Sequence, residues 1–217
     1  MDQAVGLDVS CEPPWLQVDL GAPHRCLGWA VHRPGRVVAR HVVWLQVDEA
    51  ELAPGVDPAA LLGARLAARG LARAVGLMTA RRVSAWEAGR AVVGDVGVDT
   101  VLTLGLSNAV HVAGEAGPQP WRPGTINLLA RLSVPLTDAA LVEAVSIAAE
   151  ARTAALLETA GPAGGPLTGT GTDCIVIAVP PGPGRPYAGL HTATGQALGR
   201  AVYDTTRRAA LAWQAQH

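Results

Sequence analysis

The stretch Gly169-Thr170-Gly171-Thr172-Asp173 combines two glycines, two hydroxyls and a carboxylate directly before an apolar run. If Asp173 begins a buried strand, burial favours proton uptake by its carboxylate, as a general base requires. Gly169 and Gly171 let the backbone approach a ligand closely, and consecutive N–H groups there are expected to form an oxyanion hole. The alternative is a tight turn in which Asp173 caps the strand or binds the loop backbone.

His191 is the second candidate for proton transfer, because it precedes the last helix that we expect. The positive end of the helix dipole favours the neutral imidazole, which can accept a proton. A capping or turn residue is the plainer interpretation of a histidine at this place. Thr172 completes the catalytic candidates, although an unassisted threonine is a poor nucleophile, and substrate hydrogen bonding is the expected role of most of these hydroxyls.

Hydroxyl and amide side chains near strand ends are candidates for binding a substrate. Asn108 and Asn127 follow small residues, where a side-chain amide can fix a substrate carbonyl or amide, or else stabilise a turn. The full set of expected substrate-binding residues is Thr79, Ser107, Asn108, Thr125, Asn127, Gly169, Thr170, Gly171 and Thr192.

The charged residues narrow the possible chemistry. The chain has no lysine, which excludes a Schiff-base lysine, a Walker-type phosphate loop and a Ser-Lys dyad. The formal net charge is −1 and neither sign forms a long run, so we expect no nucleic-acid partner. No apolar stretch approaches the roughly 18 residues that span a bilayer, so we expect no membrane association.

Cysteine usage predicts a cytoplasmic protein. Cys11, Cys26 and Cys174 are widely spaced and form no CxxC pair, which fits a reducing compartment without disulfides or a zinc site. His111 and Glu115 lie four residues apart without a third ligand at a recognisable spacing, so we expect no protein-bound metal.

Apolar runs separated by turn residues predict a mixed α/β fold. Asp57-Pro58 opens a helix that reaches about Leu71, and two longer helices are expected at residues 137–159 and 192–213. The expected strands cover residues 15–20, 26–32, 37–47, 75–79, 100–106, 126–134 and 174–179.

We expect one domain over residues 1–217, a layered sheet of roughly 8–10 strands with helices packed on it. Residues 42–80 and 125–179 each have the order strand, helix, strand, which suggests two duplicated halves at about residues 15–104 and 105–213. If the halves are related, strand ends from both should meet at one central site.

Three segments of the second half resemble the adenosylcobinamide amidohydrolase family. The first is GLSNA at residues 105–109 with PGTIN at 123–127, and the second is EARTAAL at 150–156. The third is TGTGTDCIVIA at residues 168–178, followed by YAGLHTATG at 187–195 and by Val202-Tyr203. The resemblance runs from roughly residue 16 to residue 208 and is strong beyond about Gly105.

The resemblance implies an enzyme that hydrolyses the amide joining a corrin propionyl side chain to aminopropanol in adenosylcobinamide. The product would be adenosylcobyric acid, which is used in cobalamin salvage. A corrinoid is then the small-molecule partner, cobalt belongs to that substrate, and no other cofactor is expected. Assembly into a homo-oligomer is compatible with this interpretation.

Trp29, Pro34 and Trp44 depart from the family pattern, which usually has a Ser-Ser/Thr-Ala run, a Gly-Gly turn and an Asn at these places. Two other interpretations therefore stay open, namely hydrolysis of a different amide and corrinoid binding without turnover. Trp29, Trp44 and Trp121 are also candidates to wall a pocket for a flat macrocycle.

Overall fold

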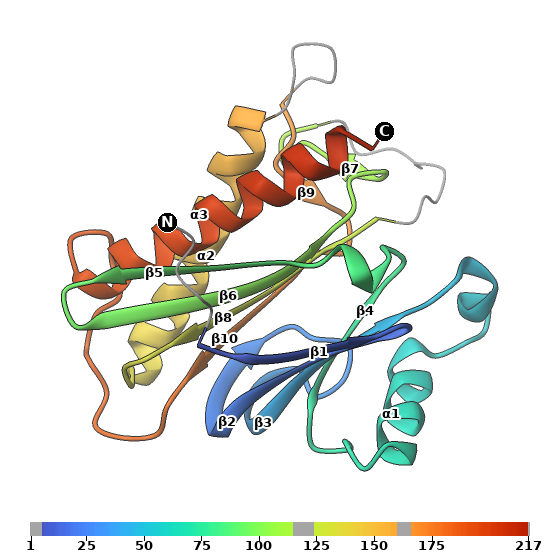
Figure 1. Ribbon diagram of the computed structural model, residues 1–217, viewed down its shortest axis with the longest axis horizontal. Coiled ribbons are helices and arrows are strands. Elements are labelled where there is room, and N and C mark those ends of the chain that lie inside the picture. Colours follow the sequence, from blue (N-terminus) through green and yellow to red (C-terminus); the bar gives the residue numbers. More distant parts are fainter. Residues whose placement is uncertain (1–5, 115–123, 160–165, 217) are drawn as a thin grey trace.

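The computed structural model describes residues 6–114, 124–159 and 166–216, and Figure 1 shows their arrangement. The helices are α1 (Pro58–Ala68), α2 (Asp138–Thr159) and α3 (Ala193–Gln214), with short 3₁₀ helices η1 (Glu49–Leu52) and η2 (Val83–Ala85). The strands are β1 (Asp8–Glu12), β2 (Trp15–Gly28), β3 (Gly35–Gln46), β4 (Val75–Thr79), β5 (Glu87–Val93), β6 (Val96–Leu104), β7 (Ala109–Val110), β8 (Ile126–Leu132), β9 (Gly169–Thr170) and β10 (Cys174–Val179).

Eight of these strands form one mixed sheet within the described residues. Their order is β4-β3-β2-β10-β8-β6-β5, with β1 paired to β2. β3 and β4 are parallel, as are β8 and β10, and the chain between the members of each pair contains a helix. The remaining pairs in this sheet are antiparallel, and β7 and β9 form a separate two-stranded ladder.

The sheet bends back on itself along β2, so that the molecule has four layers. The register of β2 against β3 shifts between Asp19 and His24; the first part of β2 pairs with β1 and the last part with β10. Leu16 of β2 and Trp44 of β3 lie in the same buried cluster as Leu129 of β8. The layers are therefore α1, the β2-β3-β4 part, the β10-β8-β6-β5 part, and α2 with α3 (Figure 1).

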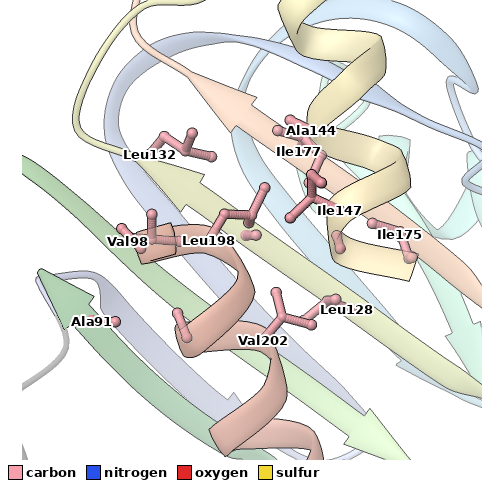
Figure 2. Close-up of a cluster of buried hydrophobic side chains, with 14 of the residues drawn as sticks. Ala91, Val98, Leu128, Leu132, Ala144, Ile147, Ile175, Ile177, Leu198 and Val202 are labelled. Atoms are coloured by element: carbon pink, nitrogen blue, oxygen red, sulfur yellow. The ribbon is translucent and has the colours of Figure 1, made fainter. Parts of the chain in front are cut away.

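Apolar side chains at helical spacing attach the helices to the sheet. Figure 2 shows Ala144 and Ile147 of α2 and Leu198 and Val202 of α3 in one cluster with Leu128 of β8. In the ranges that the structure describes, no helix has both the length and the apolar character needed to cross a membrane.

The expected fold class is confirmed, and the strands 75–79 and 174–179 were predicted with their observed bounds. The expected runs 15–20 and 26–32 form a single strand, β2, because its partner β3 continues along both parts. The predictions missed β1, β5, β7 and β9. β5 is a strand because it pairs along β6, and at Gly89 a Cβ would lie 2.1 Å from the Thr205 hydroxyl of α3. That close approach of a helix could not be predicted from local sequence.

The two strand-helix-strand units are β3-α1-β4 and β8-α2-β10. The end of β4 lies against the start of β8, where Asn127 Nδ2 donates a hydrogen bond to Met78 O at 2.7 Å. Strand ends from both halves therefore meet at one place, as expected. The duplication itself, and the single domain over residues 1–217, stay predictions.

Candidate active site

A cavity of about 420 Å³ opens where the ends of β3 and β4 meet the starts of β8 and β10. Its volume lies within the range of about 300–1,000 Å³ that is usual for small-molecule sites. Most of the polar lining residues come from the second half of the chain: Asn108, Gly124, Thr125, Asn127, Gly171, Thr172 and Asp173. Most of the apolar lining residues come from the first half and include Trp29, Val31, Val47, Leu52, Pro58 and Leu77, and the first half also adds the polar residues Asp48 and Thr79.

The Asp173 carboxylate is 8% exposed and accepts four hydrogen bonds. Its Oδ2 accepts from Arg152 Nη1 at 2.8 Å and from Thr170 N at 3.0 Å, while its Oδ1 accepts from Ile126 N at 3.1 Å and from the Thr170 hydroxyl. A carboxylate has about four acceptor positions, so little capacity remains for a substrate. The role of Asp173 as a general base stays a prediction, and the alternative role, binding the loop backbone, is the one that these bonds match.

The loop before β10 is held from several sides around Thr172. The Thr125 hydroxyl donates to Thr172 O at 2.7 Å, and the Thr172 hydroxyl donates to Gly124 O at 3.0 Å. Trp29 Nε1 donates to the main-chain oxygen of Asp173. Thr172 is nevertheless exposed and lines the cavity, so the loop presents its hydroxyl at a fixed place.

Three further polar side chains reach the cavity from different segments. Asn127 is 2% exposed, its Nδ2 donates to Met78 O, and its Oδ1 has the Thr125 hydroxyl at 3.5 Å and keeps capacity to accept from a further donor. The Thr79 hydroxyl accepts from Arg81 N at 3.0 Å. The side chain of Asn108 makes no hydrogen bond with any residue that the structure describes, and its Oδ1 is buried. The Asn108 amide nitrogen is therefore available to a bound molecule.

The two glycines of the loop have different surroundings. A Cβ at Gly169 would lie 2.5 Å from Asp173 Oδ2, so this glycine is needed for the close approach of the carboxylate. A Cβ at Gly171 would meet nothing within 4 Å, and Gly171 lines the cavity. Of the two glycines expected to approach a ligand, only Gly171 lines the cavity.

His191 and Thr192 lie far from this cavity. They follow β10, whereas Asp173 precedes it, and a six-residue strand spans about 20 Å. A Cβ at Gly94, in the turn between β5 and β6, would lie 3.9 Å from the first residue of α3. Thr192 caps α3 by accepting from Gly195 N at 3.0 Å, and His191 is exposed. The structure does not bring these two residues to the site, and the plainer interpretation of His191 as a residue of the helix start fits its position.

The predicted site residues other than His191 and Thr192 can be divided into those that line the cavity and those that do not. Thr79, Asn108, Thr125, Asn127, Gly171, Thr172 and Asp173 all line the cavity. Gly169 and Thr170 contact the Asp173 carboxylate, and neither is among the lining residues. Ser107 is exposed and also lies outside the lining.

Only one of the three departures from the family pattern touches the cavity. Trp29 is a lining residue with 48% of its surface exposed. Trp44 is fully buried in the core, so its expected role as a pocket wall is wrong, because its ring fills the space between the two parts of the sheet. Pro34 is exposed away from the lining residues, and Trp121 lies outside the described residues.

Arg152 and Asp48 are two residues that the sequence predictions did not assign to the site. Arg152 is a lone cation within the alanine-rich segment EARTAAL, a signal that it has a specific partner. Asp48 follows β3, is exposed and lines the cavity. Its backbone N–H donates to Glu51 Oε2 at 2.8 Å, as in the capping of a helix start, and this pattern alone did not indicate a site.

The cavity contains groups for acid–base and hydrolytic chemistry. Asn108 and the loop backbone offer hydrogen-bond donors, Thr172 a hydroxyl, and Asp48 a carboxylate. Burial raises the pKa of the lining Cys174 thiol to about 12, so it is not a thiolate nucleophile at neutral pH. Glu115 lies outside the described residues, and the described ones contain no group of three or more side chains suited to holding a metal ion.

Sequence comparison points to one family. Residues 2–217 match the model of a family described as adenosylcobinamide amidohydrolase. A curated protein of the same name from Halobacterium salinarum is 39% identical over 117 residues, which cover 51% of this chain and 48% of that protein. The match thus spans about half the length of this relative.

Solved structures show similarity of fold. The PH0078 protein from Pyrococcus horikoshii OT3 superposes with a TM-score of 0.51 at 10% identity, over 93% of this chain and 82% of that one. A β-aminopeptidase from Burkholderia sp. gives a TM-score of 0.48 at 13% identity, over 90% and 78% of the two chains. At these identities the likeness concerns the fold alone, and the second is too distant to support an argument.

Proposed function

The chain belongs to the adenosylcobinamide amidohydrolase family, and from this premise we propose that it hydrolyses the amide between aminopropanol and a corrin propionyl side chain in adenosylcobinamide. Water adds its hydroxyl to the acyl carbon, the carbon–nitrogen bond breaks, and the amine takes up a proton. The products are adenosylcobyric acid and aminopropanol, within corrinoid salvage. Cobalt enters only as part of the substrate, and we place the reaction in the cytoplasm, in line with three free cysteines.

The observation that carries the proposal is the composition of the polar lining. Asn108, Asn127 and Thr172 come from the segments that resemble the family, and they converge on one cavity although they are far apart in the sequence. Amide hydrolysis requires donors for the carbonyl oxygen, a nucleophile and a source of protons for the leaving amine. These groups and Asp48 can meet these requirements.

We assign the recognition of the amide to two asparagines and the loop. Asn108 Nδ2 and the backbone N–H of Gly171 donate to the carbonyl oxygen as it gains negative charge. Asn127 Oδ1 accepts from the substrate N–H, since its own Nδ2 is already bound to Met78 O. The orientation of the amide is thereby defined at both of its ends.

We assign the nucleophile to a water molecule bound beside Thr172. The described contact of the Thr172 hydroxyl is a carbonyl oxygen, which cannot remove its proton, and an unassisted threonine is a poor nucleophile. Among the described residues two carboxylates line the cavity, and that of Asp173 is occupied by four donors. Asp48 is therefore the carboxylate that exchanges a proton with the water and the leaving amine.

Asp173 then contributes by positioning the loop. Its carboxylate binds Ile126 at the start of β8, Thr170 of β9 and Arg152 of α2. Thr172 directly precedes Asp173 in the sequence, so these bonds also fix its place. A displacement of about 1 Å in a catalytic group can lower a rate a hundredfold, so the pair acts on turnover without contacting the reacting atoms.

Incubation of the protein with adenosylcobinamide, followed by mass spectrometry of the corrinoids, tests the proposal. We expect adenosylcobyric acid and free aminopropanol in equal amounts. Asp48→Asn should lower kcat by about 10² to 10⁴, the usual contribution of acid–base catalysis, without changing the melting temperature. Asp95→Asn is the matched control, because Asp95 is 73% exposed in the turn between β5 and β6, at the other end of the sheet.

Two results would contradict the assignments. Full turnover by Asp48→Asn would exclude a role of Asp48 in proton transfer. A covalent adduct on Thr172, trapped by rapid acid quench, would show that the Thr172 hydroxyl and not water is the nucleophile. Absence of product with wild-type protein would refute the activity itself.

A second candidate is hydrolysis of a different amide, and the observation that favours it is Trp29, a departure from the family pattern that lines the cavity. Corrinoid binding without product would instead indicate a binding protein that does not turn over. If the protein neither binds nor hydrolyses adenosylcobinamide, a different amide is favoured as the substrate, and it should be sought among acylated aminoalcohols.

A further inference from the structure

Trp29 has an unusual combination of exposure and fixed orientation. Its surface is 48% exposed although it lines the cavity, and its Nε1 donates to the main-chain oxygen of Asp173. The preceding Gly28 allows this position, since a Cβ there would lie 2.4 Å from Ile175 O of β10. The close approach of β2 to β10 thus places an indole ring beside the loop that contains Thr172.

The surroundings of Trp29 form an apolar rim. Val31, Leu52 and Pro58 also line the cavity, and Leu52 and Val31 are partly exposed. The polar side chains of Asn108, Asn127 and Thr172 line the same cavity. A ligand that fits this lining has a flat apolar part next to the indole and an amide-bearing arm that reaches Asn108 and the loop.

We infer that Trp29 is a specificity-determining residue, whose ring is the surface on which the macrocycle of the substrate lies. This inference rests on the proposed function. A cavity of about 420 Å³ accepts the aminopropanol arm but is small for a whole corrinoid, so the macrocycle stays at the rim. A half-exposed aromatic ring with a fixed orientation offers apolar area to a flat ligand with little loss of side-chain freedom on binding.

The test uses adenosylcobyric acid as the probe, because it has the macrocycle but lacks the aminopropanol arm. Trp29→Ala should raise the Kd of this probe by about 10- to 100-fold, measured by equilibrium dialysis, and should raise the Kd of adenosylcobinamide by a similar factor. Trp29→Phe keeps a flat ring and should change the Kd less than about threefold, while kcat falls because the bond to Asp173 O is lost.

Tyr187→Ala is the matched control, because Tyr187 is an aromatic residue with 68% exposure that follows β10, away from the cavity. It should leave the Kd of both corrinoids unchanged. A melting temperature of Trp29→Ala close to that of the wild type shows that a change in Kd does not come from unfolding.

The outcomes separate this inference from the proposed function. Wild-type hydrolysis together with an unchanged Kd in Trp29→Ala would overturn the inference alone. Tight binding that depends on Trp29, without product, would support the inference and refute the proposed hydrolysis. Failure of the wild-type protein to bind either corrinoid would overturn both.

Discussion

Replacing Arg152 with methionine removes the guanidinium from its ion pair with Asp173 and keeps an apolar side chain of comparable reach. The pair lies between α2 and the loop before β10, with the two side chains 13% and 8% exposed. The Asp173 carboxylate would then remain buried with its three other donors, from Ile126 and Thr170. The substitution therefore tests whether this pair maintains the loop.

The magnitude follows from burial and from the donors that remain. Removing one partner of a buried ion pair costs about 3–5 kcal/mol, because the other charge is left uncompensated. A hydrogen bond to a charged group contributes about 1.5–3 kcal/mol, and three neutral donors still bind Asp173 in the variant. We therefore expect Arg152→Met to lower the free energy of unfolding by about 2–3 kcal/mol, which lowers the melting temperature by about 5–10 °C in a chain of this size.

Urea and thermal denaturation followed by circular dichroism measure this change. Arg185→Met is the matched control, since Arg185 pairs with Asp95, whose side chain is 73% exposed, and exposed pairs contribute less than about 1 kcal/mol. Arg152→Lys keeps the charge and should recover most of the stability. Turnover of adenosylcobinamide by Arg152→Met should fall about a hundredfold at a temperature where the variant is folded.

Combining Arg152→Met with Asp173→Asn completes a double-mutant cycle. If the pair is coupled, the double variant is more stable than the sum of the single changes predicts, because no charge is left unpaired. A wild-type melting temperature in Arg152→Met, or strict additivity in the cycle, would show that the pair does not hold the loop.

Three more predictions concern the loop, the distant histidine and acid stability. Gly169→Ala should destabilise the protein by about 1–3 kcal/mol, because its Cβ would lie 2.5 Å from a carboxylate oxygen of Asp173. Gly171→Ala should leave the melting temperature unchanged, and it should lower turnover because its methyl group would lie in the cavity. His191→Ala should retain wild-type kcat and KM, since β10 separates it from the site, and a loss of tenfold or more in kcat would restore it as a catalytic candidate. The hydrogen bond from Arg40 lowers the pKa of Asp19 from 3.8 to about 2, so the pair stabilises the folded protein above about pH 4, and this contribution is lost as the pH falls toward 2. The free energy of unfolding of Asp19→Asn, measured by urea denaturation between pH 4 and pH 2, should therefore depend less on pH than that of the wild type. Identical pH profiles of the two proteins would contradict the assignment.

Local signals were sufficient for most of the elements. Asp57 and Pro58 predicted the start of α1, where Asp57 accepts from Ala59 N and Ala60 N. Unbroken apolar runs predicted β4 and β10 with their observed bounds. Such signals depend on a few neighbouring residues, so no tertiary contact is needed to interpret them. β9 lacks them, because this two-residue strand exists through pairing with the distant β7, whereas β1 pairs with the adjacent start of β2.

The distance of His191 from the cavity had a signal in the sequence itself. The apolar run 174–179 lies between Asp173 and His191, and a strand crossed once places the residues before it and after it at opposite ends of the sheet. The family resemblance made both residues candidates, although resemblance says nothing about distance. The pairing of Asp173 with Arg152 had no comparable signal, because the two residues are 21 positions apart on different elements.

Residue types and short-range periodicity predicted the α/β class and the long helices, and the family segments predicted Asn108, Asn127 and Thr172 as site residues. The folded arrangement was needed to find that Asp173 is bound by Arg152, that Trp29 lies at the cavity while Trp44 is buried in the core, and that Asp48 is also a lining residue. These roles depend on which strand ends meet when the sheet bends along β2, and that bend results from packing between distant segments.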